Sequence, residues 1–459
     1  MSVVLPQGWQ DYRLEDCVEV LDSLRVPINN AERQSRIEGK PAEQLYPYYG
    51  ATGQVGVIDD FLFDEELVAL GEDGVPFLDP FKPKAYMLRG KTWVNNHAHV
   101  LRGLDGIALN KFVFYYLNQF DYQDYVNGGT RLKLTQASMR VIPIPLPPFA
   151  EQTRIAAKLD ELLAQVDTLK TRIDGIPALL KRFRQSVLAA AVSGRLTEEQ
   201  RGGAASSPLS QPPLVFSERD QGVVPEGWRW EKLVSLAELE SGHTPRKSVP
   251  AYWENGDIPW ISLQDIRAAD GKEISETKHM PTMLGIENSS ARLLPKGTVC
   301  FSRDISVGFV TIMGRSMATT QHFANWVCKG QLFPKYLMYS FMAGRDHLLQ
   351  SGQGSTVKTI YMPALKELRL LLPPLAEQTE IVRRVEQLFA LADQLEARVK
   401  AAQARIDRLT QSILAKAFRG ELVPQDPNDQ PASVLLERIK AQRAAAPKAR
   451  RGRRAATLG

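Results

Sequence analysis

The feature that most constrains the fold of this chain is a stretch that occurs twice. Residues 146–155 (LPPFAEQTRI) return as residues 372–381 (LPPLAEQTEI), at a shift of 226 positions. The shift does not drift further along the chain, so segments 146–194 and 372–420 align without a gap. An internal repeat of this kind indicates a doubled architecture, which takes precedence over the interpretation of any single motif.

Both copies carry apolar residues spaced alternately by three and four positions. This 3.5-residue period, sustained over several heptads, predicts a long coiled-coil helix that needs a partner, and each copy is the expected partner of the other. A Pro-Pro pair precedes each helix, and Gly194 and Gly420 are expected to end them. Gly175 and Pro177 are expected to kink the first helix. The residues expected at the helix-pair interface are Ile155, Leu159, Leu162, Val166, Leu169, Ile173, Leu180, Phe183 and Val187, with Ile381, Val385, Leu388, Leu395, Val399, Ile406, Leu409 and Ile413.

A second repeat shows that the doubled unit is a globular domain followed by a helix. Residues 5–9 (LPQGW) match residues 224–228 (VPEGW), ahead of stretches with strand, turn and short helix patterns. We therefore expect an α+β fold, with two mixed α/β domains joined by two long antiparallel coiled-coil helices in a pseudo-two-fold repeat. The expected parts are domain one at 1–149, the first helix at 150–196, a mobile linker at 197–223, domain two at 224–374, the second helix at 375–422, and a short helix with a basic disordered tail at 423–459.

Composition places the chain among proteins of a reducing cytoplasm. Its apolar runs are too short to span a membrane, and its first residues lack the pattern of a secretion signal. Cys17, Cys300 and Cys328 are far apart and form no metal-ligand spacing. The net charge is +5, but basic residues are concentrated at 448–454, so the overall charge is weak evidence for a nucleic-acid partner.

The sequence carries no recognisable catalytic motif. A phosphate-binding loop, a dinucleotide fingerprint and a nucleophile elbow are all missing. Leu146-Pro147-Pro148-Phe149 resembles the motif of amino-methyltransferases, but leucine cannot accept a hydrogen bond from a flipped base. His97 and His99 would share one face of a strand, yet no Cys or Asp cluster supports a metal site. We expect no catalytic residue and no metal site.

Basic, amide and aromatic side chains do gather in turn-rich parts of both domains. Arg, Lys, Asn and Gln are the side chains that read base edges or hold phosphates, although a solvated surface is the competing interpretation for each one. The candidate DNA-binding residues are Tyr48, Tyr49, Lys91, Asn95, Asn96, His97, Arg131 and Lys133 in domain one, and Thr244, Arg246, Lys247, Gln264, Arg303, Gln353 and Lys358 in domain two.

The whole arrangement resembles the specificity subunits of type I restriction-modification systems. The resemblance covers the chain to about residue 422 and is carried by paired motifs. These are Gly8-Trp9 and Gly227-Trp228 at the domain openings, 48–53, 242–245, 253–262 and 354–358 within the domains, and Ala150-Glu151-Gln152 and Ala376-Glu377-Gln378 at the helix starts.

The resemblance implies that each domain is a target-recognition domain that reads one half of an asymmetric bipartite DNA sequence. It also implies that the helices set the spacer and dock two subunits of an adenine-N6 DNA methyltransferase, with restriction/translocase subunits completing the complex. S-adenosylmethionine, ATP and Mg²⁺ are then expected on partner subunits and no cofactor in this chain, which would be non-catalytic. The alternatives are a coiled-coil scaffold whose domains bind protein and, less favoured, a self-sufficient nuclease or methyltransferase.

Overall fold

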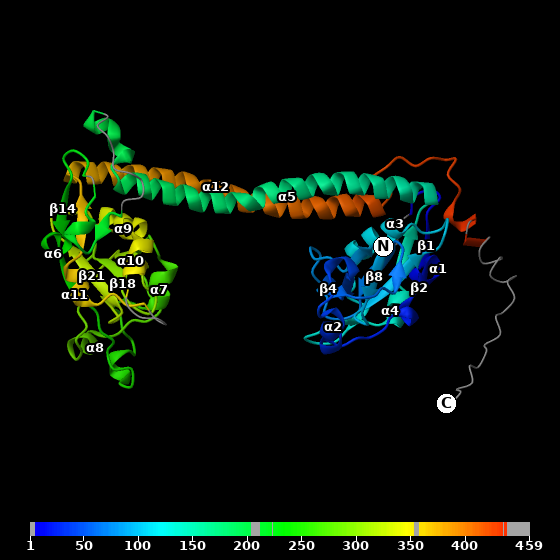
Figure 1. Cartoon of the computed structure of the whole chain (residues 1–459), viewed down its shortest axis with the longest axis horizontal. Coiled ribbons are helices and arrows are strands. Elements are labelled where there is room, and N and C mark those ends of the chain that lie inside the picture. The colour runs from blue at the N-terminus through cyan, green and yellow to red at the C-terminus, as the bar shows by residue number, and fades with distance from the viewer. Residues whose placement is uncertain (1–4, 203–211, 223, 353–357, 435, 438–459) are drawn as a thin grey trace. The chain divides into compact units, whose positions relative to one another are not determined.

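The computed structural model describes residues 5–202, 212–222, 224–352, 358–434 and 436–437. The chain forms two compact units, drawn in Figure 1: unit 1 comprises 1–174 with 400–459, and unit 2 comprises 175–399. The helices α5 (Phe149–Val192) and α12 (Leu375–Phe418) each contribute one part to unit 1 and one part to unit 2. Among the described residues, no helix is both long enough and apolar enough to cross a membrane.

Unit 1 is built on an antiparallel sheet with the strand order β2-β9-β6-β7. A second sheet, in the order β4-β3-β8-β5, contains the parallel pair β3 and β8. All five residues of β6 are buried, as its apolar sequence LVALG requires. The strands are β1 (Gln10–Arg13), β2 (Val18–Val20), β3 (Tyr46–Gly50), β4 (Gly53–Ile58), β5 (Phe63–Asp64), β6 (Leu67–Gly71), β7 (Ala85–Leu88), β8 (Lys91–Val94), β9 (Ala98–Gly103), β10 (Val126–Asn127), β11 (Lys133–Leu134) and β12 (Pro143–Leu146). The helices are α1 (Leu14–Cys17), α2 (Asn30–Ile37), α3 (Asn110–Gln119) and α4 (Gln136–Arg140).

Unit 2 repeats this plan with an added strand. Its main sheet has the order β15-β21-β18-β19-β17, in which only β17 runs parallel to its neighbour. A parallel pair, β16 with β20, takes the place of β3 with β8. The strands are β13 (Leu214–Val215), β14 (Arg229–Lys232), β15 (Ala237–Ser241), β16 (Trp260–Ile261), β17 (Glu273–Ile274), β18 (Val299–Ser302), β19 (Val310–Met313), β20 (Ala318–Thr319), β21 (Phe323–Cys328) and β22 (Arg369–Leu372). The helices are α6 (Leu233–Leu236), α7 (Leu263–Ala268), α8 (Met283–Glu287), α9 (Pro334–Ala343), α10 (Arg345–Ser351) and α11 (Met362–Lys366).

The register of the central strands makes the two units directly comparable. In unit 1, Gly71 at the end of β6 faces Ala98 of β9, and in unit 2, Ser302 at the end of β18 faces Phe323 of β21. The strands therefore correspond as β2 with β15, β9 with β21, β6 with β18 and β7 with β19. The mixed α/β content predicted for both domains is confirmed.

The two long helices pack antiparallel in each unit, as predicted. In unit 1, Lys170 lies 3.5 Å from Asp407, and one turn further along α5 Asp174 accepts a 2.7 Å hydrogen bond from Gln403. In unit 2, Arg184 pairs with Asp393 at 2.6 Å. From one contact to the next, the residue number in α5 rises by the same amount as the residue number in α12 falls. The two helices therefore run antiparallel.

Some of the residues predicted at the helix-pair interface are exposed, so that prediction is partly wrong. Leu169, Leu395 and Leu409 are 47%, 39% and 47% exposed, because two helices alone cover only one side of each seam residue. Leu162, Ile173, Phe183 and Leu388 are half-buried against the cores. The residues confirmed as buried are Ile155, Leu159, Val166, Leu180, Val187, Ile381, Val385, Val399, Ile406 and Ile413.

The repeated Ala-Glu-Gln motif fastens each helix to its own unit. Fully buried Gln378 accepts a hydrogen bond from the backbone N–H of Phe333 at 2.8 Å and donates to the carbonyl oxygens of Gln331 and Pro373. Gln152 makes the same three bonds, to Leu109, Ile107 and Pro147, in unit 1. The first turn of each helix is thereby tied to the segment that begins α9 or α3.

The neighbouring glutamates behave differently in the two units. Glu377 accepts hydrogen bonds from Trp228 Nε1 at 2.9 Å and Thr197 Oγ1 at 2.7 Å, and it pairs with Arg201. Glu151 is also buried, but neither of its oxygens has a hydrogen-bond partner among the described residues. Burial raises the pKa of the Glu151 carboxyl.

The ends of the two long helices agree with prediction, whereas the linker agrees only in part. Gly194 and Gly420 follow α5 and α12 with φ of +79° and +71°, which confirms that both glycines end the helices. The helix α5 continues through Pro177, and the kink expected there stays a prediction. The linker prediction for 197–223 is partly wrong, because Leu214 and Val215 are fully buried as strand β13 against β22.

The remaining predicted segments are only partly described. Residues 432–434 and 436–437 are helical, in agreement with the short helix expected there. The basic tail at 448–454 and part of the linker lie outside the described residues.

Candidate nucleic-acid interface

In unit 1, three of the predicted residues meet where β6 ends and β9 begins. The His97 Nδ1 atom lies 3.1 Å from a carboxylate oxygen of Asp73. The backbone N–H of His97 donates to Asn95 Oδ1 at 2.8 Å, and the N–H of Glu72 donates to the carbonyl oxygen of His97 at 2.8 Å. These bonds fix the two loops against each other. Asn96, between Asn95 and His97, is exposed.

Two basic side chains join the same loop. Arg131 donates to Asp73 at 2.7 Å, and Lys133 pairs with Glu72 at 3.1 Å. Burial raises the pKa of Asp73, but hydrogen bonds from His97 and Arg131 outweigh that effect and hold the pKa below its usual value. The side chains of Arg131 and Lys133 are 65% and 52% exposed, so both remain accessible from solvent while paired with these carboxylates.

Unit 2 has the same arrangement at the corresponding positions, where β18 ends and β21 begins. The His322 Nδ1 atom lies 2.6 Å from Asp304, and the His322 N–H donates to Thr320 Oγ1 at 3.2 Å. The N–H of Arg303 donates to the carbonyl oxygen of His322 at 3.0 Å, as Glu72 does to His97. The His–Asp pair is therefore a shared feature of both units.

The polar side chains around the second pair differ from those of the first. Arg303 donates to the carbonyl oxygen of Gln321 at 3.0 Å, and the Gln321 side chain accepts from Thr244 Oγ1 at 2.7 Å. Thr244 and Arg303 are thus brought together as predicted residues of one site. Gln321, His322 and Asp304 were missed, because only the paired strands β18 and β21 bring them together and no local sequence pattern marks them.

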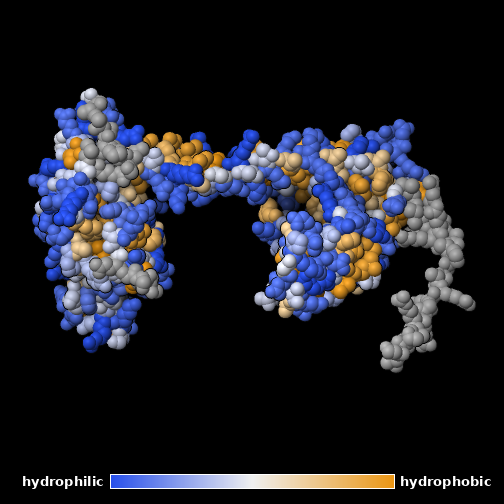
Figure 2. Space-filling model, viewed as in Figure 1, coloured by the Kyte–Doolittle hydropathy of each residue, from blue (hydrophilic) through white to orange (hydrophobic). Residues whose placement is uncertain are grey.

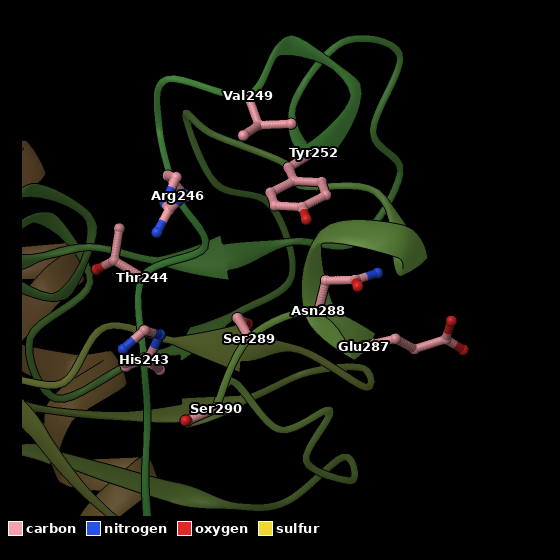
Figure 3. Close-up of a pocket in the computed structure, with 9 residues that line it drawn as sticks. All are labelled: His243, Thr244, Arg246, Val249, Tyr252, Glu287, Asn288, Ser289 and Ser290. Carbon is pink, nitrogen blue, oxygen red and sulfur yellow. The ribbon is translucent and has the colours of Figure 1, made fainter.

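A pocket of about 730 Å³ lies beside this cluster in unit 2 (Figure 3). Figure 3 shows Arg246 and Tyr252 facing the space above Ser289, whereas the carboxylate of Glu287 points away from them. The lining of the pocket is mostly polar, which suits a hydrogen-bonding ligand better than an apolar one. The lining residues are His243, Thr244, Arg246, Val249, Tyr252, Glu287, Asn288, Ser289 and Ser290.

The side chains of three predicted residues of unit 1 point away from the His97–Asp73 contact, although the carbonyl oxygen of Tyr49 accepts a hydrogen bond from the Asn95 N–H at 3.0 Å. Tyr48 is only 5% exposed and packs in the core with Trp93, so the prediction of a surface role for its ring is wrong. Tyr49 stacks on Tyr86 with a ring separation of 5.4 Å. Lys91 begins β8, at the opposite end of that strand from Asn95, and its Nζ atom lies 4.7 Å from the ring of Phe61.

In unit 2, three predicted residues also lie apart from the His–Asp pair. Lys247 is exposed beside Trp253 and Trp260, and Gln264 is exposed on α7. Lys358 donates to the carbonyl oxygen of Gly352 at 3.2 Å. Gln353 lies outside the described residues.

The two neighbouring histidines of unit 1 make separate contacts. His97 precedes β9, while His99 is buried within it and contacts Asp22 at 2.7 Å and the carbonyl oxygen of Leu134 at 3.0 Å. The expectation that both would share one strand face is therefore wrong. Within the part of the chain that the structure describes, no group of three His, Cys, Asp or Glu residues could hold a metal ion.

The chain is similar in sequence to known proteins. The family model described as "Type I restriction modification DNA specificity domain" matches residues 6–178 and 225–402. The chain is 37% identical to the EcoKI specificity subunit of Escherichia coli strain K12, over 69% of this chain and 68% of that protein. It is 29% identical to the Escherichia coli EcoDI specificity subunit over 96% of both proteins.

Solved structures show the same fold at lower sequence identity. The HsdS subunit from Thermoanaerobacter tengcongensis superposes with a TM-score of 0.56 at 20% identity, over 91% of this chain and 98% of that one. A chain from a study of complex assembly and conformational transition of the type I R-M system gives 0.61 at 18% identity, over 91% and 100%.

Proposed function

The chain belongs to the type I restriction-modification DNA specificity family, and we propose that it selects the DNA target of such a complex without itself being catalytic. Each unit reads one half of a bipartite sequence, and the two units form a pseudo-two-fold repeat. The relatives named as specificity subunits support this proposal, as does the matched construction of the two units. We place the complex in the cytoplasm, where its DNA target is found.

One observation carries the proposal above the others. The pairs His97–Asp73 and His322–Asp304 fix corresponding loops, yet the exposed side chains around them differ between the units. A shared frame with different hydrogen-bonding groups is suited to reading two different half-sites, because base edges are distinguished by their donor and acceptor patterns. The target is therefore asymmetric.

The basic side chains of the candidate interface supply affinity for the sugar-phosphate backbone of DNA. Arg131 and Lys133 reach solvent in unit 1, and Arg246 does so in unit 2. Contacts of this kind neutralise phosphates and position the protein, while the polar groups beside them discriminate between bases.

The helix pair docks the subunits that carry out the chemistry. Leu179, Leu391 and Leu395 are 59%, 49% and 39% exposed in unit 2, and Figure 2 shows hydrophobic residues on the exposed surface of these helices. Leu169 and Leu409 are similarly exposed in unit 1. Exposed leucines on helices suit packing against helices of other subunits. Two methyltransferase subunits bind there, restriction/translocase subunits complete the complex, and S-adenosylmethionine, ATP and Mg²⁺ bind to these partners.

The experiment that tests the proposal is duplex DNA binding by the full chain together with a methyltransferase subunit. The observed association constant should fall linearly with salt on a logarithmic scale, and a sequence-specific fraction should survive competition by unrelated duplex. A coiled-coil scaffold whose units bind protein would show neither behaviour. Binding that falls with salt but is lost entirely to competitor DNA would contradict sequence recognition.

A further inference from the structure

One residue in the candidate nucleic-acid interface of unit 2 adopts a backbone conformation that its side chain disfavours. Ile305, in the loop between β18 and β19, has a φ of +56°. L-residues rarely adopt left-handed conformations, and for a β-branched residue this is a genuine outlier. The Ile305 side chain is also 55% exposed, so it gains little from burial in the core.

Unit 1 has glycine at the corresponding position. Asp73 and Asp304 occupy equivalent places, since each contacts the histidine that precedes β9 or β21. The next residues are Gly74, with a φ of +68°, and Ile305. The loop therefore turns through the left-handed region in both units, and unit 1 uses the one residue that does so without strain.

The loop around Ile305 is held on both sides. Gly308 N–H donates to the carbonyl oxygen of Ser302 at 3.0 Å, Phe309 N–H donates to Ser302 Oγ at 2.9 Å, and Arg267 donates to Ser306. Together with the Asp304–His322 contact, these bonds fix the backbone while the isoleucine side chain is directed to solvent. Strain that the surrounding bonds maintain at an exposed position is characteristic of functional sites.

From these observations we propose that Ile305 is a specificity-determining residue that places its apolar side chain against bases of the half-site read by unit 2. The inference rests on the proposed function and extends it to one residue. Apolar side chains recognise thymine methyl groups in the major groove and wedge against base steps in the minor groove. Gly74 offers no such contact in unit 1.

The test uses the full chain with its methyltransferase subunit and a pool of duplexes of randomised sequence, from which the bound fraction is sequenced. The variants are Ile305→Gly and Ile305→Asn, which relieve the backbone and remove the apolar group, and Ile305→Leu, which keeps it. Leu293→Ala, at an apolar residue of unit 2 that is 42% exposed, is the matched control.

We expect Ile305→Gly to leave the Tm unchanged or higher, while it weakens binding of the best wild-type duplex about tenfold. Base preference should be lost at one or two positions of one half-site only, with Ile305→Asn behaving likewise and Ile305→Leu and Leu293→Ala retaining the wild-type motif. Unchanged preferences with Ile305→Gly, or a lowered Tm, would overturn the inference but leave the proposed function intact. If the wild-type chain enriches no sequence, both fail.

Discussion

Replacing Gln378 with leucine should loosen unit 2 and leave unit 1 intact. The Gln378 side chain is fully buried, and its three hydrogen bonds satisfy the N–H of Phe333 and the carbonyl oxygens of Gln331 and Pro373. Leucine fills a similar volume but leaves all three backbone groups without their partner. At about 1 kcal/mol for each group, the expected loss is about 3 kcal/mol of the free energy of unfolding of unit 2.

Native-state hydrogen exchange measures this loss separately in each unit. A destabilisation of about 3 kcal/mol raises the population of the open state roughly 100-fold, so amides of α9 should exchange faster by that factor. Exchange in α3 of unit 1 should not change. The matched variant, Gln152→Leu, should produce the reverse pattern, with α3 loosened and α9 unaffected. Equal loosening of both units by either variant, or no change at all, would refute the claim that each glutamine fastens its helix to its own unit.

Three further predictions follow from the same contacts. Burial raises the pKa of Glu151 above its ordinary value of 4.5, so the folded unit binds that proton more tightly than the unfolded chain and loses stability as pH rises above about 4.5. Glu151→Gln should therefore stabilise unit 1 at pH 7, as measured by urea unfolding. Glu377→Gln removes the ion pair with Arg201 and should destabilise unit 2. If both variants, or neither, stabilised their units, the proposed difference between the two glutamates would be contradicted. Burial raises the pKa of the Cys300 thiol, so iodoacetamide at pH 8 should modify it only after urea unfolding, and rapid labelling of the folded chain would be the contrary result. Deleting 167–173 together with 404–410, two segments centred on the Lys170–Asp407 pair, shortens the helix pair by about 10 Å. The spacer between half-sites should then shorten by about 3 base pairs with both half-sites retained, and altered half-sites would argue against a spacer length set by the helix pair.

The long helices were predictable from the sequence because their information is local and repeated. A heptad pattern needs no knowledge of distant residues, and Gly194 and Gly420 mark the helix ends by their conformational freedom alone. Burial along the seam was less predictable. Leu169 and Leu409 fit the pattern as well as Val166 does, but exposure depends on what else covers the helices.

The candidate site was only partly predictable, because strand pairing assembles it. His97 and Arg131 are residue types that suit DNA, yet their meeting at Asp73 depends on the pairing of β6 with β9 and on the bridge between Asp73 and Lys133. Tyr48 is also a residue type that suits DNA but is buried, since an aromatic residue in a strand can pack in a core as well as at a surface.

The equivalence of Gly74 and Ile305 could not be read from the sequence. The domain openings repeat at one shift and the helices at another, so the positions of insertions between them are undetermined until strand registers are known. That equivalence identifies Ile305 as an unusual residue, which neither its local sequence nor its exposure alone would do.

The most direct test of the central claim, that two units of one fold each read half of a DNA target, is a map of N6-methyladenine. Genomic DNA would be sequenced from cells that express the chain with its methyltransferase subunits and from cells that lack it. The account predicts methylation confined to an asymmetric motif of two short fixed blocks separated by a constant number of unspecified base pairs. Methylation within a single uninterrupted block, or an unchanged pattern when the chain is removed, would contradict it.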